Sequence, residues 1–237
     1  MEFAIIAAGE GSRLKEEGFK HSKPMVVLQN RTLIERLIKI FINNKADKIH
    51  IIINEYSPEL SNHLNSLISD VPLNIITRST PSSLHSFFEV LPFVQSSKIC
   101  LTTVDTVFHE AEFRNFIEHF KMNDRTDGLM AATSFIDDEK PLYIGTDQEL
   151  NITGFYDSKQ YKTKLVSGGI YCLTKQVYPV VKKAVESGAS QMRNFQRLMI
   201  TEGMHLKAYP FSKIIDIDHV TDIAKAEAFL NEAGKNN

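Results

Sequence analysis

Short apolar runs alternate with amphipathic segments along the first half of the chain. Five β-rich apolar runs predict buried strands at residues 2–8, 48–53, 73–77, 98–104 and 128–135. Between them, apolar residues recur at helical spacing, which predicts helices at residues 33–41, from 57 onward, 84–94 and 110–120. This βαβα order predicts an α/β fold, in which a Rossmann-like, mainly parallel but mixed sheet is covered by helices on both faces.

The second half of the chain is less regular. Residues 141–155 predict short strands and turns, and "LVSGGIYCL" (165–173) predicts a strand that is entered through paired glycines. The remaining pattern predicts helices at residues 174–187, 190–202 and 220–232, and a strand near 205–210. No repeat and no Pro/Ser-rich linker divides the chain, so we expect a single domain over residues 1–237.

The composition is that of a globular protein, with 43% apolar and 24% charged residues. The formal net charge of -2 does not favour nucleic acid as a partner, so any phosphate site must be local. Cys100 and Cys172 lie in apolar runs, which indicates buried thiols in a reducing compartment. The N-terminal run is too short for a signal peptide, and no run approaches the ~20 residues of a membrane span. We therefore expect a cytoplasmic protein without a membrane partner.

A cationic, glycine-containing loop, "AAGEGSRL", follows the first predicted strand. Ligands of open α/β sheets bind beyond the carboxyl ends of strands, where small residues let a ligand approach the backbone. The residues expected to contact a phosphate through the backbone are Ala7, Ala8, Gly9, Gly11 and Ser12. Arg13 adds a planar charged fork and Lys23 a mobile point charge, so the loop is predicted to bind a phosphorylated ligand.

Other phosphate-binding loops match this segment less well. There is no Gly-Lys-Ser/Thr, and Leu14 stands where a dinucleotide fingerprint has its third glycine. A long polar stretch precedes the next apolar run, so we expect a long loop that closes over the ligand. Taken alone, Gly9 and Gly11 are equally consistent with a glycine turn whose neighbouring charges are solvated.

"AAGEGSRL" followed by "SKPM" resembles the N-terminal signature of the sugar-phosphate nucleotidyltransferases and related NTP transferases, a strand followed by Gly-x-Gly-x-Arg and then Lys-Pro. A thinner resemblance continues through Asp105, "SGGIY" and "DIDHVTDI", so it covers nearly the whole chain. It implies a nucleotide-diphospho-sugar transferase (GT-A-like) architecture, with a nucleotide-binding half at 1–135 and an acceptor-binding half at 136–237. It also implies catalytic roles for Arg13, on the leaving pyrophosphate, and for Lys23, on the phosphates.

Two aspartates are candidates for a magnesium site. Nucleotidyl transfer brings two anions together. A Mg²⁺ ion, held by one or two carboxylates and by phosphate oxygens, relieves the repulsion between these anions. "CLTTVDTVF" places Asp105 at the end of a buried strand, although a turn-capping role is the alternative. "DHVTDI" resembles the family's Asp-Thr-Pro-Glu-Asp-Leu-like string, which implies Asp218 as the second ligand. Asp216 shares a strand face with Asp218 and is the reserve candidate, whereas Asp222 is expected to be structural.

Two further segments are candidates for binding the nucleobase and the acceptor. Ser82 and Ser83 stand where the family has a Gly-Thr-Ala-like turn beside the base, but they are also ordinary helix caps. Gly168 and Gly169 resemble the glycines that meet the acceptor, with a β-bulge as the alternative. Lys159 is nearest to the family's Glu-Lys-Pro and is expected at the acceptor phosphate, although it and the nearby lysines could equally form a solvated hairpin.

The resemblance implies an enzyme that transfers a nucleoside monophosphate from an NTP to a phosphorylated acceptor and releases pyrophosphate. The acceptor is expected to be a sugar 1-phosphate, giving an NDP-sugar, with a cytidylyltransferase of an alditol phosphate or phosphocholine as the alternative. A nucleotide-sugar-dependent glycosyltransferase and a non-catalytic nucleotide-binding module are rivals from other classes. The sequence leaves the nucleobase and the oligomeric state open.

Overall fold

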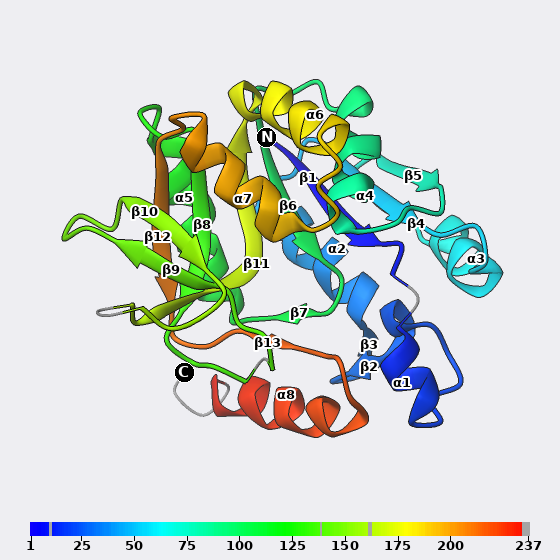
Figure 1. The fold of residues 1–237 in the computed structure, drawn as a ribbon. Helices are drawn as coiled ribbons and strands as arrows, with labels where there is room; N and C mark the ends of the chain where they lie inside the picture. Colours follow the sequence, from blue (N-terminus) through cyan, green and yellow to red (C-terminus); the bar gives the residue numbers. More distant parts are fainter. Residues whose placement is uncertain (10, 138, 161–162, 234–237) are drawn as a thin grey trace.

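A central β-sheet runs through the protein, and strands from both halves of the chain build it (Figure 1). The computed structural model describes residues 1–9, 11–137, 139–160 and 163–233. Within these residues the order β10-β9-β11-β6-β1-β4-β5 forms the main path, while β8 pairs with β11 and β12 pairs with β8. The strands are β1 (Glu2–Ala7), β4 (Ile49–Ile53), β5 (Leu73–Thr77), β6 (Lys98–Thr103), β8 (Gly128–Thr133), β9 (Tyr143–Thr146), β10 (Ile152–Tyr156), β11 (Leu165–Thr174) and β12 (Leu206–Phe211).

The sheet is parallel in its first half and becomes mixed in its second half. Strands β6, β1, β4 and β5 are parallel neighbours, whereas β11 is antiparallel to both β6 and β8. The carboxyl ends of β1, β6 and β8 therefore meet the start of β11 at one edge of the sheet. This arrangement confirms the predicted mixed, mainly parallel sheet and gathers loops from both halves of the chain at that edge.

Helices cover both faces of the sheet, as predicted. One face packs against α2 (Leu33–Asn43), α3 (Pro58–Ser66), α5 (Glu110–Met122) and α8 (Val220–Ala233), and the other against α4 (Ser83–Val90), α6 (Tyr178–Glu186) and α7 (Met192–Thr201) (Figure 1). Aromatic rings pack together on the first face, where the Phe41 ring lies 4.6 Å from that of Phe3 in a tilted arrangement and 5.7 Å from that of Phe113 in a stacked one, centroid to centroid. No helix among the described residues is both long enough and apolar enough to cross a membrane.

The segment after β1 differs from the predicted long loop. It contains the short helix α1 (Ser12–Glu16), a 3₁₀ turn at Lys23–Met25, and a small hairpin of β2 (Val27–Leu28) and β3 (Arg31–Thr32). The side chain of Leu14 is buried in the core and anchors α1, although the residues around it are polar. The prediction of an extended loop here was therefore wrong.

Several predicted helices were also too long, and a second small sheet, besides the hairpin of β2 and β3, was not predicted. The predicted helix 84–94 ends at Val90 and continues as a 3₁₀ turn at Leu91–Phe93, and 174–187 begins with a 3₁₀ turn at Lys175–Val177 before α6. Strands β7 (Thr106–Val107) and β13 (Ile215–Asp216) pair antiparallel outside the central sheet. Strands of two residues are too short to show a period in the sequence.

A buried polar network lies at the end of the sheet where β1 and β4 begin. The Glu2 carboxylate contacts His50 Nε2 at 2.7 Å and accepts hydrogen bonds from the backbone N–H groups of Gln95 and Ser96. The other ring nitrogen of His50 is 3.0 Å from the side-chain amide of Asn74. Burial lowers the pKa of His50 and outweighs the opposing effect of Glu2.

The lowered pKa of His50 predicts a loss of stability in mild acid. Below about pH 6.5 the unfolded chain binds a proton at this histidine that the folded protein does not, so the free energy of unfolding should fall as the pH is lowered. Urea denaturation at pH 7.5 and pH 5.5 should show a smaller loss for His50→Gln than for the wild type. Equal losses in the two proteins would contradict this assignment.

Candidate active site

Four charged residues from distant parts of the chain meet beyond the carboxyl ends of β1 and β6. The Lys23 ammonium donates to Asp105 Oδ2 at 2.8 Å and to Asp218 Oδ1 at 2.7 Å. Arg13, on α1, donates from Nη1 to Asp218 Oδ2 at 3.0 Å. The two aspartates thus lie on either side of one nitrogen atom. The structure therefore brings together the four residues that the sequence suggested as catalytic and metal-binding.

The pairing of β7 with β13 explains how the two ends of this cluster meet. Asp105 immediately precedes β7, and β13 ends two residues before Asp218. Asp216 pairs with Thr106 in register, and the backbone N–H of Ile217 donates to the Asp105 carbonyl at 3.1 Å. Figure 1 shows β7 and β13 beside the central sheet, between it and α8.

The charges in the cluster shift one another's pKa values. Burial by itself would raise the pKa of Asp105, but the Lys23 ammonium outweighs it and holds that pKa below its usual range. Burial would lower the pKa of Lys23, yet the two carboxylates raise it, so Lys23 is cationic at any physiological pH. Asp216 forms no ion pair with another described residue. It is exposed at the surface, yet the protein atoms around its carboxylate, followed by the negative charges of Asp105 and Asp218, raise its pKa to about 8.

The loop that carries Asp218 is tied to two helices. The Asp222 carboxylate, in the first turn of α8, accepts from the backbone N–H groups of Asp218 at 3.2 Å and His219 at 2.8 Å. Glu17, at the end of α1, accepts from the Val220 N–H at 2.7 Å and contacts His219 Nδ1 at 2.5 Å. Asp222 thus has the structural contacts expected of it, whereas no pattern in the sequence indicated Glu17.

A first cavity, of about 410 Å³, lies between the β1 loop and the start of α4. Among the predicted nucleotide-site residues, those that line it are Ala8, Gly9, Gly11, Ser82 and Ser83, together with Lys23 and Asp105. Ala7 is buried within β1, and Ser12 lies in the first turn of α1, so neither is part of this lining. The Ser82 hydroxyl accepts from the His85 N–H at 3.4 Å, so the helix-cap alternative is also present.

The two glycines of the first loop differ in what surrounds them. Gly11 has a φ of 60° and caps the start of α1, and a Cβ there would lie 3.1 Å from Lys23 Cβ. Within the part of the chain that the structure describes, and apart from its immediate chain neighbours, a Cβ at Gly9 would meet no atom within 4 Å. Gly11 is therefore required by the turn and by the approach of Lys23, whereas the packing of the described residues does not by itself require glycine at position 9.

A second cavity, of about 370 Å³, adjoins the first and shares Ser82, Ser83, Thr103 and Asp105 with it. The rest of its lining is mainly polar: Leu142, Ser167, Gly169, Tyr171, Ser190, Gln191, Met192, Arg193, Gln196, Asp216 and Asp218. The two cavities meet at Asp105, so two ligands can approach each other there. We refer to them below, after the ligands expected from the sequence, as the nucleotide cavity and the acceptor cavity.

The paired glycines of β11 have separate surroundings. Gly169 lines the acceptor cavity and has a φ of 73°. Gly168 lines a third cavity instead, and a Cβ there would collide with the Ile214 side chain. The pairing of β11 with β8 shifts register between Ser167 and Tyr171, so the β-bulge alternative is present as well.

Lys159 is not brought to the cluster. It is exposed beyond the end of β10 and lines none of the three cavities around Asp218 and Asp105. Lys162 lies outside the described residues. Arg193 and Gln196, which do line the acceptor cavity, were not identified from the sequence. Their spacing of three residues places them on one helix face, but an arginine near a helix start usually indicates solvated surface.

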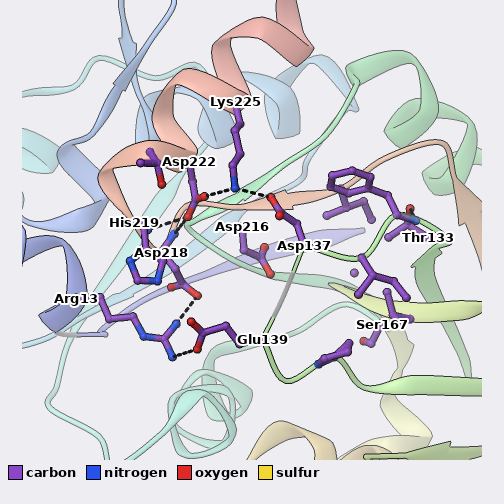
Figure 2. A pocket seen from close by; sticks show the side chains of 17 residues that line it. Arg13, Thr133, Asp137, Glu139, Ser167, Asp216, Asp218, His219, Asp222 and Lys225 are labelled. Atoms are coloured by element: carbon purple, nitrogen blue, oxygen red, sulfur yellow. Dashed lines mark hydrogen bonds and ion pairs between the residues drawn. The ribbon is translucent and has the colours of Figure 1, made fainter. Parts of the chain in front are cut away.

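The third cavity, of about 240 Å³, lies on the other side of Asp218 (Figure 2). Its charges form pairs across it. The Arg13 Nη2 is 4.0 Å from Glu139 Oε2, and the Lys225 ammonium lies between Asp137 Oδ2 at 3.0 Å and Asp222 Oδ1 at 3.1 Å. These pairs join α1 and α8 to the segment between β8 and β9.

The donor set around Lys23 fits a magnesium ion that shares its ligands with a substrate. Among the described residues, no group of three or more His, Cys, Asp or Glu side chains is arranged to enclose a metal. Asp105 and Asp218, however, present oxygens to one point, which the Lys23 ammonium occupies in this structure, so a metal ion would take this place only as Lys23 moves onto a substrate phosphate. Mg²⁺ is commonly held by one or two carboxylates and completed by phosphate oxygens and water, so two aspartates are sufficient.

Comparison with known proteins defines the family. Residues 4–233 match the family model described as nucleotidyl transferase, and the chain therefore belongs to this family of enzymes. No curated protein sequence matches it. The inositol-1-phosphate CTP transferase of T. maritima superposes with a TM-score of 0.81 at 18% identity, covering 98% of this chain and 96% of that one.

Two further structures share the fold. A protein assigned as a glucose-1-phosphate thymidylyltransferase, from Bacillus anthracis and solved with sucrose, has a TM-score of 0.83 at 18% identity, covering 97% of this chain and 94% of that one. HddC from Yersinia pseudotuberculosis has a TM-score of 0.73 at 16% identity, covering 97% and 99%. These likenesses confirm the expected nucleotide-sugar transferase-like architecture.

The contacts of Asp222 predict a cost in stability when they are removed. Asp222→Ala leaves the N–H groups of Asp218 and His219 without their acceptor and should lower the free energy of unfolding by about 1–2 kcal/mol. Asp137→Ala is the matched control, because Asp137 pairs with the same Lys225 but has an exposed side chain. Urea denaturation should show little change for the control, and equal effects of the two substitutions would contradict the capping role.

Proposed function

We propose that this nucleotidyltransferase transfers a nucleoside monophosphate from an NTP to a phosphorylated acceptor and releases pyrophosphate. The strongest support for this function is that two cavities join at Asp105, beside Lys23 and Asp218. One cavity is lined by backbone-exposing glycines and the other by hydroxyl and amide groups. Such a pair suits a nucleotide and a polar acceptor whose reacting phosphates meet at the shared wall.

In this proposal the triphosphate lies along Ala8, Gly9 and Gly11, with the base toward Ser82 and Ser83. The open space at Gly9 supports this placement, because a phosphate can approach the backbone there without displacing protein atoms. Residues 1–135 then form the nucleotide half and residues 136–237 complete the acceptor half.

Asp105 and Asp218 would hold Mg²⁺, which when bound would neutralise phosphate charge and help to orient the two substrates. Lys23 and Arg13 contribute positive charge from the same cluster, with Lys23 free to turn toward the substrate phosphates once a metal ion holds the carboxylates. They are placed to stabilise charge that develops on the leaving pyrophosphate, and they keep the phosphates aligned.

The bond-forming step needs no general base in the protein. An acceptor phosphate is already ionised near neutral pH, so one of its oxygens can attack the α-phosphorus directly while the bond to pyrophosphate breaks. Lys23 stays protonated because the two carboxylates raise its pKa, so it acts as a cation and not as a base. Catalysis would then consist of alignment and charge stabilisation.

The acceptor we propose is a sugar 1-phosphate or a closely related cyclic polyol phosphate. Two structural neighbours carry such acceptors in their names, inositol 1-phosphate and glucose 1-phosphate. Hydroxyl and amide side chains dominate the described lining of the acceptor cavity, and Tyr171 is its one aromatic residue. A phosphocholine head group would favour several aromatic rings around its ammonium, so this lining favours a polyol. The cytoplasmic location expected from the sequence stays a prediction.

Pyrophosphate release tests this function. Each of the four NTPs with Mg²⁺ is combined with glucose 1-phosphate or inositol 1-phosphate, and we expect release that depends on both substrates and stops when EDTA removes the metal. Asp105→Asn and Asp218→Asn should each lower turnover by about 10²–10³-fold, since each weakens the stabilisation of phosphate charge.

Asp124→Asn is the matched control for these substitutions, because Asp124 is an exposed aspartate paired with Lys98 away from both cavities. It should retain wild-type turnover. Full activity in folded Asp105→Asn would exclude the proposed metal site, and release without any phosphorylated acceptor would exclude the proposed reaction.

A further inference from the structure

The acceptor cavity has an unbalanced set of charges. The carboxylates of Asp105, Asp216 and Asp218 line it, whereas the described part of its lining contains a single cationic side chain, Arg193. Lys23 contacts two of these carboxylates but lies on the wall of the nucleotide cavity. A phosphorylated acceptor brings further negative charge into this space, and like charges at short range repel. Binding an acceptor here therefore calls for a cation on the far side of the cavity.

Arg193 is held in place by two hydrogen bonds. Its Nη1 donates to Asp157 Oδ1 at 2.7 Å, and its Nη2 donates to the Lys140 carbonyl at 3.0 Å. Asp157 is itself held by Arg197, whose Nη2 is 2.7 Å from Asp157 Oδ2. These contacts use only part of the guanidinium, which carries five N–H donors. The side chain is thus fixed in orientation with donors remaining for a ligand.

The surroundings of Arg193 also favour an anion. It lies in the first turn of α7, and Ser190, Gln191 and Met192 line the same cavity at the start of that helix. The Gln191 side chain does not cap the helix, and a helix N-terminus is electropositive. One turn further on, Gln196 is only 1% exposed and donates to the Ser167 hydroxyl at 3.2 Å, which adds a fixed amide to the lining.

We propose that Arg193 binds an anionic oxygen of the acceptor and so determines that the acceptor is phosphorylated. This inference rests on the proposed function and assigns to Arg193 the contact that the sequence suggested for Lys159. A guanidinium suits this contact because its planar fork can donate two parallel hydrogen bonds to one phosphate.

A purely structural role for Arg193, as the partner of Asp157, is the competing explanation. A substitution at Arg197 distinguishes the two explanations. Arg197 pairs with the other oxygen of the same carboxylate and donates to the Phe155 carbonyl at 3.2 Å, but it does not line the cavity. Arg197→Gln therefore weakens the hold on Asp157 and leaves the cavity lining unchanged.

Calorimetric titration with glucose 1-phosphate and with inorganic phosphate tests the proposal on the wild type, Arg193→Gln, Arg193→Lys and Arg197→Gln. Each protein is first saturated with a non-hydrolysable NTP analogue, so that the phosphates of the analogue occupy Arg13 and Lys23. Arg193→Gln should weaken binding of both probes by about 10- to 100-fold, as expected for the loss of hydrogen bonds to a charged group. Arg193→Lys should fall in between, and Arg197→Gln should match the wild type.

Three outcomes would overturn the inference: no binding of either probe to the wild type, wild-type affinity in Arg193→Gln, or equal losses in Arg193→Gln and Arg197→Gln. The affinity for the NTP analogue, measured in the same series, should be unchanged in all variants. If the analogue binds and the Arg193 effect is absent, this inference alone fails. If no NTP analogue binds the wild type, the proposed function fails.

Discussion

The Lys23 ammonium, held between the carboxylates of Asp105 and Asp218, is the interaction around which the site is organised. Two negative side chains this close repel each other unless a cation lies between them. The pairing lowers the pKa of Asp105 and raises that of Lys23, so both stay charged. The guanidinium of Arg13 contacts the other carboxylate oxygen of Asp218, the one that does not face Lys23. A site built in this way offers paired positive and negative charge to a ligand that carries both phosphates and a divalent ion.

The fold explains why residues so far apart in the sequence reach one point. In the parallel part of the sheet, the loops that follow β1 and β6 leave from the same edge, so the glycine loop and Asp105 are neighbours. Antiparallel β11 begins at that edge and brings the second half of the chain beside it. The two-residue pairing of β7 with β13 then adds the segment before α8, and hydrogen bonds from Glu17 and Asp222 fix the Asp218 loop.

The features that could be predicted from the sequence are those marked by a long periodic pattern of apolar residues or by a short motif whose chemistry is recognisable. The strands of the central sheet and most helices follow from apolar runs and spacing, and the cluster of Arg13, Lys23, Asp105 and Asp218 was suggested by motif positions. Features that arise only in the folded state were missed. Helix α1 depends on the burial of a single leucine, and the roles of Glu17 and Arg193 depend on partners far along the chain. The sequence shows charged residues at exposed helical positions, but not what they face.

The position of a bound divalent ion would show whether Asp105 and Asp218 act together on an NTP. Mn²⁺ can replace Mg²⁺ in oxygen-ligand sites, and its anomalous scattering identifies it in a crystal grown with a non-hydrolysable NTP analogue. We predict an anomalous peak at the point where the carboxylates of Asp105 and Asp218 meet, with the Lys23 ammonium displaced from that point toward the analogue phosphates. A peak elsewhere, or an analogue whose phosphates lie away from Gly9, Gly11 and Lys23, would contradict this prediction.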